Sequence, residues 1–139
     1  MPPGFIFDSE IIPAPQELNR LLYLCNEKTY SPKRLILAIE RSACKLSIFN
    51  KSTEKLVGFV RATSDKGLNA NLWNLVAEPG ENQDRFISLL INRSLQVLRR
   101  DMPGCSISVA APKFAFQALK DQGFLLDPSG IRAMGLRLR

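Results

Sequence analysis

Four stretches of the chain carry apolar residues at the three- and four-residue spacing of an amphipathic helix. The predicted helices are residues 15–28, a helix that begins at Ser31 and Pro32, residues 83–100, and residues 112–122. Prolines near the first two starts and a glycine just after the last helix agree with the usual helix boundaries. The third helix has a broad apolar side, so we expect it to pack on the core.

Short β-rich runs, separated by polar turns, fill the stretch between the second and third helices. These runs are residues 46–49, 56–63 and 72–77. Their connections are too short for a crossover, so the three strands are expected to form an antiparallel meander. Further strands are predicted at residues 5–7, 106–110, 124–126 and 131–138. The elements therefore follow the order β-α-α-β-β-β-α-β-α-β-β within one domain, residues 1–139.

Composition limits the class of protein. A chain of 139 residues is long enough for one domain with its own core, and no apolar run approaches the roughly 20 residues that span a bilayer. We therefore expect no membrane insertion. The N-terminus shows no signal or transit peptide, which predicts a cytoplasmic protein. The three cysteines lack metal-ligand spacing and are expected to be buried thiols in a reducing compartment.

The charged residues narrow the expected chemistry. The chain has no histidine, which removes the usual general base near neutral pH and the commonest zinc ligand, so no metal is expected. A formal charge of +6 favours acidic partners such as CoA phosphates, an anionic membrane surface or an acidic protein. Nucleic acid is also acidic, but the chain lacks basic residues interleaved with aromatic ones, so a nucleic-acid-binding module has only the charge in its favour.

Two sequence segments carry a resemblance to a known family. The run LVGFVRATSD at residues 56–65, followed by NANLW at residues 69–73 and by Glu78-Pro79, resembles the central strands of the GNAT N-acetyltransferases. It is especially similar to their cyanobacterial and plastid branch, and residues 119–131 resemble the closing helix and strand of that family. The resemblance implies an α/β (α+β) GNAT fold, with a mostly antiparallel mixed sheet of about six to seven strands flanked by four helices.

The resemblance also implies where acetyl-CoA would bind. In this family pantetheine pairs with exposed backbone in a gap between the fourth and fifth strands, which corresponds here to Leu75, Val76 and Ala77. The pyrophosphate lies at the start of the next helix, where free N–H groups hold the anion. The positions that the resemblance assigns to the pyrophosphate are Asn82, Arg85 and Ser88.

Three parts of the family's acetyl-transfer machinery are replaced in this chain. The glycines of the phosphate loop fall on residues 82–87, which contain no glycine and add the negative charge of Asp84 and the β-branched side chain of Ile87. The tyrosine that protonates the CoA thiolate is replaced by Leu119, and the carboxylate after Trp73 is replaced by Asn74. These replacements predict weak or lost acetyl transfer.

Two functions follow as alternatives. In the first, the chain binds a partner as a regulatory or assembly subunit, and the resemblance alone suggests a photosynthetic complex and a place at the periphery of the thylakoid membrane. In the second, it is an active acetyl-CoA-dependent N-acetyltransferase, acting on protein or small-molecule amines, in which positioning supplies most of the rate. Glu78 is then the candidate base, although a glutamate at a strand end is more often plain surface.

Other residues have a structural and a functional interpretation. Tyr23 and Tyr30 would be proton donors only if the first helices covered the cleft, and packing is the favoured role for them and for Trp73. One side of the third helix has basic residues without an intervening acid, which favours an acidic protein or the surface of a membrane complex as partner. A solvated outer face explains the pattern equally well. The predicted partner-binding residues are Arg85, Leu89, Arg93, Arg99 and Arg100.

Overall fold

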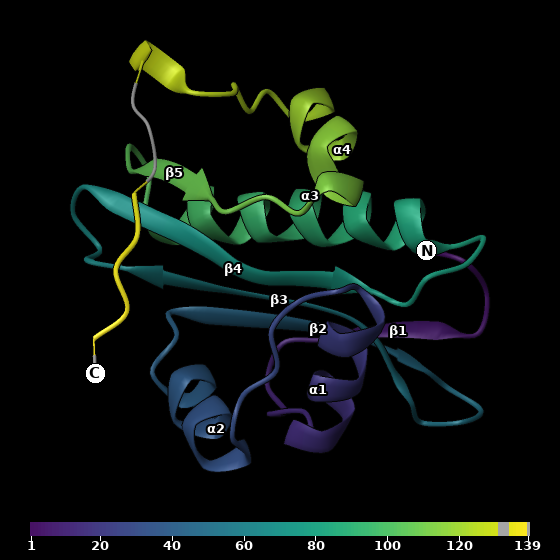
Figure 1. Ribbon diagram of the computed structural model, residues 1–139. Helices are drawn as coiled ribbons and strands as arrows, with labels where there is room; N and C mark the ends of the chain where they lie inside the picture. Colours follow the sequence, from purple (N-terminus) through teal and green to yellow (C-terminus); the bar gives the residue numbers. More distant parts are fainter. Residues whose placement is uncertain (131–133, 139) are drawn as a thin grey trace.

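The computed structural model describes residues 1–130 and 134–138 of the chain (Figure 1). Most predicted elements are present within one or two residues of the expected bounds. In chain order they are β1 (Phe5–Asp8), α1 (Pro15–Leu24), α2 (Pro32–Glu40), β2 (Cys44–Asn50), β3 (Leu56–Ser64), β4 (Asn69–Ala77), α3 (Gln83–Asp101), β5 (Ser106–Val109), the short 3-10 helix η1 (Lys113–Ala115), α4 (Phe116–Asp121) and a second short 3-10 helix η2 (Pro128–Gly130).

The sheet has the same strand order as the chain, from β1 to β5. The pairings of β1 with β2, β2 with β3 and β3 with β4 are antiparallel, so the predicted meander is confirmed. The pairing of β4 with β5 is parallel, because α3 carries the chain back across the sheet between them. Helices α1 and α2 cover one face of the sheet, and α3 and α4 cover the other (Figure 1).

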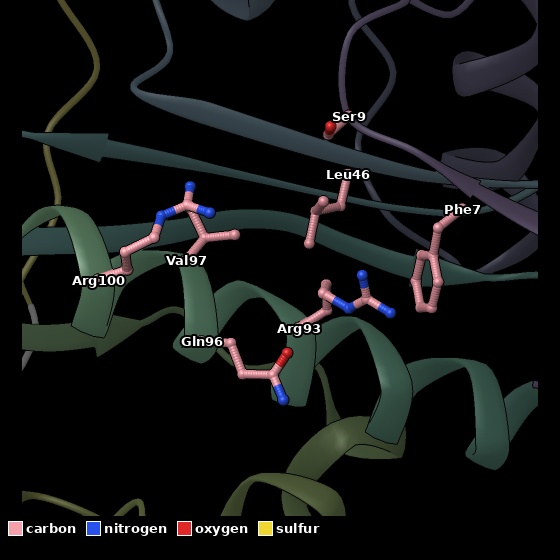
Figure 2. A pocket seen from close by; sticks show the side chains of 7 residues that line it. All are labelled: Phe7, Ser9, Leu46, Arg93, Gln96, Val97 and Arg100. Atoms are coloured by element: carbon pink, nitrogen blue, oxygen red, sulfur yellow. The ribbon is translucent and has the colours of Figure 1, made fainter.

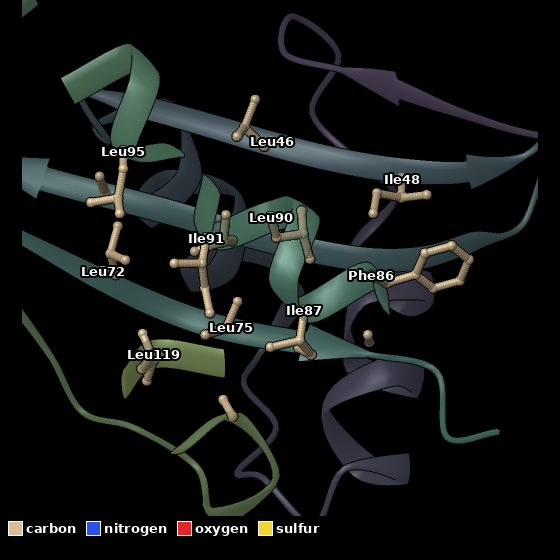
Figure 3. Close-up of a cluster of buried hydrophobic side chains, with 14 of the residues drawn as sticks. Leu46, Ile48, Leu72, Leu75, Phe86, Ile87, Leu90, Ile91, Leu95 and Leu119 are labelled. Carbon is tan, nitrogen blue, oxygen red and sulfur yellow. The ribbon is translucent and has the colours of Figure 1, made fainter. Parts of the chain in front are cut away.

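Two hydrophobic clusters lie on the two faces of the sheet. The larger cluster joins the buried side of α3 to the strands and to α4 (Figure 3). The smaller cluster joins α1 and α2 to the other face, through Leu56, Phe59 and Val76 of the sheet. The helices form because each buries an apolar side against this sheet, which their intrinsic propensity alone would not ensure.

The predicted strand at residues 124–126 is wrong. The backbone N–H of Phe124 instead donates to the carbonyl of Leu119, which closes the turn at the end of α4. Leu125 and Leu126 follow with exposed fractions of 76% and 70%, so this apolar run has no partner strand. Of the last predicted strand, residues 131–133 lie outside the described part of the chain, and residues 134–138 form no strand. The described sheet has five strands where six to seven were expected.

Candidate functional site

The strands β4 and β5 separate part of the way along β4. Their pairing covers Asn69–Leu72 of β4, and β4 then continues to Ala77 beside β3 alone. A bulge lies where the strands separate, because the register with β3 shifts there and Asn74 has a φ of 55°. The residues predicted to hold pantetheine, Leu75, Val76 and Ala77, all lie in this separated part of β4. We call the space between it and the segment after β5 the β4–β5 gap.

Side chains of the protein itself donate hydrogen bonds to the Ala77 backbone carbonyl, at the end of the β4–β5 gap. The N–H of Glu78 donates to the carbonyl of Val57 on β3, so the preceding residue, Ala77, faces the other edge. The Ala77 carbonyl accepts a bond from the Gln83 amide at 3.0 Å and from the Cys25 thiol at 3.1 Å. Burial raises the pKa of the Cys25 thiol, which keeps it in the protonated form that can donate. This carbonyl is therefore no longer free for an added strand.

An aromatic ring next to the β4–β5 gap contacts both hydrophobic clusters. Phe114 of η1 packs against the cluster under α3 and also against the cluster under α1 and α2. These clusters lie on opposite faces of the sheet, so a single side chain contacts both only where the sheet is open. The opening lies beyond the last pair of β4 and β5, Leu72 and Val109. Phe114 therefore fills space that the resemblance assigns to pantetheine.

The start of α3 presents charged residues where the family has glycines. Asn82 is at the N-cap and makes no side-chain cap hydrogen bond, while Asp84 and Arg85 are exposed and Ser88 is half-buried. Ile87 differs from the expectation, because its side chain is completely buried in the core and does not cover the end of the helix. The charges of Asp84 and Arg85 determine the field at this helix start.

Glu78 is engaged by an arginine from α1. Arg20 donates to the Glu78 carboxylate at 3.0 Å, and also to the backbone carbonyl of Leu56 at 2.8 Å. A carboxylate that removes a proton from an amine must first be free to accept it. The structure therefore gives Glu78 a role in tying α1 to the ends of β3 and β4, and leaves its catalytic role a prediction.

At the bulge of β4, the positively charged Arg61 bonds to neutral side chains. Arg61 donates to the side-chain oxygen of Asn74 at 2.7 Å and lies 3.4 Å from the hydroxyl of Ser42, and both partners are neutral. Burial lowers the pKa of Arg61, and the nearby Tyr30 opposes that effect to a smaller extent. A carboxylate at position 74 would have neutralised this guanidinium, so the asparagine leaves a half-buried positive charge beside the gap.

Three aromatic residues that were expected to pack are more exposed than that expectation implies. Trp73 is 38% exposed, and its indole N–H donates to the Thr63 hydroxyl across the strands. Tyr23 is 75% exposed and Tyr30 is 40% exposed. The side chain of Asn19 bonds to both backbone groups of Tyr30, which holds that loop without burying its ring. Leu119, which stands where the family has its proton-donating tyrosine, is buried in the core.

The predicted basic side of α3 is exposed, but only part of it meets a hollow. Arg85, Arg93, Arg99 and Arg100 are exposed, whereas Leu89 is half-buried. Arg93 and Arg100 line a hollow of about 450 Å³ beside β1 and β2 (Figure 2). Phe7 of β1, Ser9 just after β1, and Leu46 of β2 also line this hollow. No sequence pattern indicated these residues, because they lie far from α3 along the chain.

Two kinds of feature, a metal-ligand cluster and a membrane-spanning helix, are absent from the described part of the chain. Residues 1–130 and 134–138 contain no cluster of three or more His, Cys, Asp or Glu side chains that would hold a metal ion. Within the same residues, no helix is both long and apolar enough to cross a bilayer. Cys25 is buried as expected, whereas Cys44 and Cys105 are half-buried.

Comparison with curated proteins gives plastid-type relatives, although no protein-family model matches the chain. The uncharacterised N-acetyltransferase ycf52 of Pyropia yezoensis is 33% identical over 104 residues, which is 73% of this chain and 59% of that protein. The chloroplastic GCN5-related N-acetyltransferase 2 of Arabidopsis thaliana is 32% identical over 82 residues, which is 58% of this chain and 31% of that protein. The chain therefore spans less than two thirds of the length of these relatives.

Comparison with solved structures extends the likeness to nearly the whole chain. A probable acetyltransferase of unknown function from meticillin-resistant Staphylococcus aureus superimposes with a TM-score of 0.85, covering 96% of this chain and 99% of that one. The two sequences are only 12% identical, so this likeness establishes the fold alone.

Proposed function

Because this chain belongs to the GNAT superfamily, with plastid-type N-acetyltransferases among its relatives, we propose that it is an N-acetyltransferase-like protein with weak or lost acetyl transfer. In this proposal it acts by binding, as a regulatory or assembly subunit. A photosynthetic complex is the first partner to examine, because one relative is named as chloroplastic.

One observation carries the proposal of weak or lost transfer. Phe114 contacts the clusters on both faces of the sheet and so fills the β4–β5 gap. Pantetheine would have to displace this ring and also the bonds from Gln83 and Cys25 to the Ala77 carbonyl. Displacing an ordered apolar side chain costs the burial it provides, on the order of 2 kcal/mol for a large residue. That cost is subtracted from any affinity for acetyl-CoA.

The charges at the start of α3 support the same proposal. A pyrophosphate gains from the helix dipole and from free N–H groups, but the exposed Asp84 in the first turn opposes it. Arg85 offers one compensating charge beside it. Nothing at this helix start provides the backbone approach that glycines would allow.

The second candidate is an active N-acetyltransferase, and the names of the relatives favour it. In that case acetyl-CoA would be the cofactor and would supply the activated acetyl group. Phe114 would have to leave the gap, and Glu78 would have to leave Arg20 before it accepted a proton from the amine. Acetyl transfer that falls in a Glu78→Gln variant would support this candidate.

Calorimetric titration with acetyl-CoA tests the proposal. We expect no measurable heat of binding with the wild-type protein, and binding by a Phe114→Ala, Gln83→Ala, Cys25→Ala variant in which the gap and the Ala77 carbonyl are free. Phe116→Ala is the matched control, because it removes the same ring from a position that is 37% exposed and only two residues away. Micromolar binding by the wild type would reverse the conclusion and make acetyl transfer the leading function.

The proposed location is the cytoplasm, with attachment to the periphery of the thylakoid membrane through a protein partner. Fractionation of native cells at low and high salt tests it. A protein that acts as a docked subunit should sediment with membranes at low salt and be released by salt, because charged contacts are screened. Recovery in the soluble fraction under both conditions would leave the protein without a membrane-bound partner.

A further inference from the structure

A basic hollow lies on the flank of α3 that faces β1 and β2 (Figure 2). Its volume is about 450 Å³. Phe7, Leu46 and Val97 give it apolar surface, and Arg93, Arg100, Gln96 and Ser9 surround that surface with polar groups. Apolar surface inside a ring of hydrogen-bond donors is the arrangement found where a side chain of a partner inserts. We refer to this site as the basic hollow.

The two arginines of the basic hollow differ in how they are held. The guanidinium of Arg93 lies 4.8 Å from the centre of the Phe7 ring, a stacked position that keeps it at the rim. Arg100 forms an exposed ion pair with its neighbour Asp101 at 2.8 Å. In the described part of the chain, Arg93 forms no ion pair with a carboxylate. Its charge is therefore available to a ligand.

The nearest acid on β1 is turned away from the basic hollow. Phe7 and Ser9 line the hollow, while Asp8 between them points to the other side, as alternation along a strand requires. The Asp8 carboxylate accepts bonds from the backbone N–H groups of Glu10 and Ile11, so it is used in the turn that follows β1. The hollow consequently presents positive charge on an apolar floor.

The positive charge continues along α3 beyond the basic hollow. Arg85 and Arg99 are exposed on the same helix, and no acidic residue occurs between Arg85 and Arg100. That stretch is about 22 Å long at about 1.5 Å per residue. A small anion would use the hollow alone, whereas an extended chain with several carboxylates would use the hollow and the exposed arginines together.

We propose that the basic hollow docks an acidic segment of a partner protein, with one apolar side chain of the segment on its floor and flanking carboxylates on Arg93 and Arg100. This inference rests on the proposed role as a binding subunit, and it names the chemistry of the partner. The hollow is separate from the β4–β5 gap, since its lining residues come from β1 and the residue after it, from β2, and from the C-terminal half of α3. Binding of a ligand in the basic hollow therefore does not require a change in the β4–β5 gap.

Fluorescence polarisation with defined peptides tests the proposal on the full chain. The probe is a fluorescein-labelled peptide of the sequence Glu-Glu-Leu-Glu-Glu, and the comparison peptides have Ala in place of Leu or Gln in place of every Glu. We expect saturable binding of the first peptide, and at least tenfold weaker binding of the other two. An apolar anchor and the flanking charges would then both be required.

Variants of the protein locate the binding. The double variant Arg93→Gln, Arg100→Gln should bind the peptide at least tenfold more weakly than the wild type. Ser9→Glu should have the same effect, because it places an acid at the rim of the hollow. Lys113→Gln is the matched control, because it removes one exposed positive charge from η1, outside the hollow, and should leave the affinity unchanged. Circular dichroism of each variant shows whether it is folded.

Several results of these binding experiments would overturn the proposed docking site. No saturable binding at millimolar peptide, or equal weakening by Lys113→Gln, would overturn the proposal, because the binding would be absent or merely electrostatic. Stronger binding to phosphatidylglycerol vesicles or to single-stranded DNA than to the peptide would also overturn it. The acetyl-CoA titration is independent of these results: a wild type that binds acetyl-CoA refutes the loss of transfer, and a failed peptide refutes only the docking site.

Discussion

The two flanks of α3 have opposite characters. On the flank toward β5 and α4, the β4–β5 gap is filled by Phe114, and the Ala77 carbonyl is taken by Gln83 and Cys25. On the flank toward β1 and β2, the basic hollow stays open between Phe7 and Arg93. The closed flank consists of apolar and neutral polar contacts. On the open flank Arg93 has no carboxylate partner in the described part of the chain, and Arg100 pairs with the exposed Asp101.

The difference shows how one helix serves two purposes. Apolar side chains that fill a gap stabilise the fold, and their removal leaves a cavity. Exposed arginines add little to folding, because water already solvates them, but they provide specificity for a partner. Substitutions on the closed flank should therefore change stability most, and those on the open flank should change association most. Four measurements, taken from the largest expected effect to the smallest, test this division.

Phe114→Ala should have the largest effect on folding. Loss of a ring that contacts both clusters should lower the free energy of unfolding by about 2–4 kcal/mol, a little below the range for fully buried phenylalanine because Phe114 is half-buried. Urea unfolding measures this change. Phe116→Ala should cost less than Phe114→Ala, because the Phe116 ring is 37% exposed. Equal costs for the two variants would mean that Phe114 does not fill the gap.

Asn74→Asp, beside the gap, should raise the free energy of unfolding by about 1 kcal/mol. The new carboxylate would replace a neutral acceptor of Arg61 with a charged one, and charge-assisted bonds are stronger than neutral ones. The positive φ of residue 74 is tolerated by aspartate as well as by asparagine. Thermal unfolding provides the measurement, with Asn74→Ala as the comparison that removes the acceptor. A lower melting temperature in Asn74→Asp would show that Arg61 already has a compensating charge.

Arg93→Gln should change stability by less than about 1 kcal/mol. The substitution removes the stacking on Phe7, and exposed cation–π pairs contribute about 0.5–1 kcal/mol. The same substitution should strongly weaken binding of the acidic peptide. This would separate the role of the open flank in association from the role of the closed flank in stability. Chemical denaturation and fluorescence polarisation on one protein sample compare the two effects. A large loss of stability would assign Arg93 to the fold.

Alkaline pH should have the smallest effect, and it should act on the closed flank. The raised pKa of Cys25 means that the folded protein holds this proton more tightly than the unfolded chain does. Its contribution to stability is complete below the unfolded pKa and is lost as the pH rises through the folded pKa, so unfolding should become easier above about pH 9. Cys25→Ala should show a weaker decline than the wild type. An unchanged decline would place the titration at Cys44, whose pKa burial also raises.

Most of the fold could be predicted from the sequence because the periodicities are strong. The apolar side of α3 and the short turns between β2, β3 and β4 determine those elements locally. The run at Leu125 and Leu126 shows the limit of such patterns: it has the composition of a strand, but a strand also needs a neighbour with which to pair. The same limit applies to Trp73, whose position in β4 suggested burial although the residue is 38% exposed.

The candidate site was less predictable, because it depends on contacts between distant residues. Periodicity identifies Phe114 as apolar but does not show that it reaches both faces of the sheet. The missing glycines at residues 82–87 were visible, yet the orientation of Ile87 into the core was not. The basic side of α3 was visible too, whereas the hollow needed Phe7 and Leu46 from strands far along the chain.

The identity of strand order and chain order has a consequence for how the protein folds. The β1–β2 pairing must wait for α1 and α2, but each hairpin from β2 to β4 closes a short loop, so this part of the sheet has mainly local contacts. Only the parallel pairing of β4 with β5 requires the whole of α3 to form first. Loop closure of this kind slows folding. We therefore expect β1 on one edge, and β5 with η1 and Phe114 on the other, to join the sheet after the β2–β4 meander has formed.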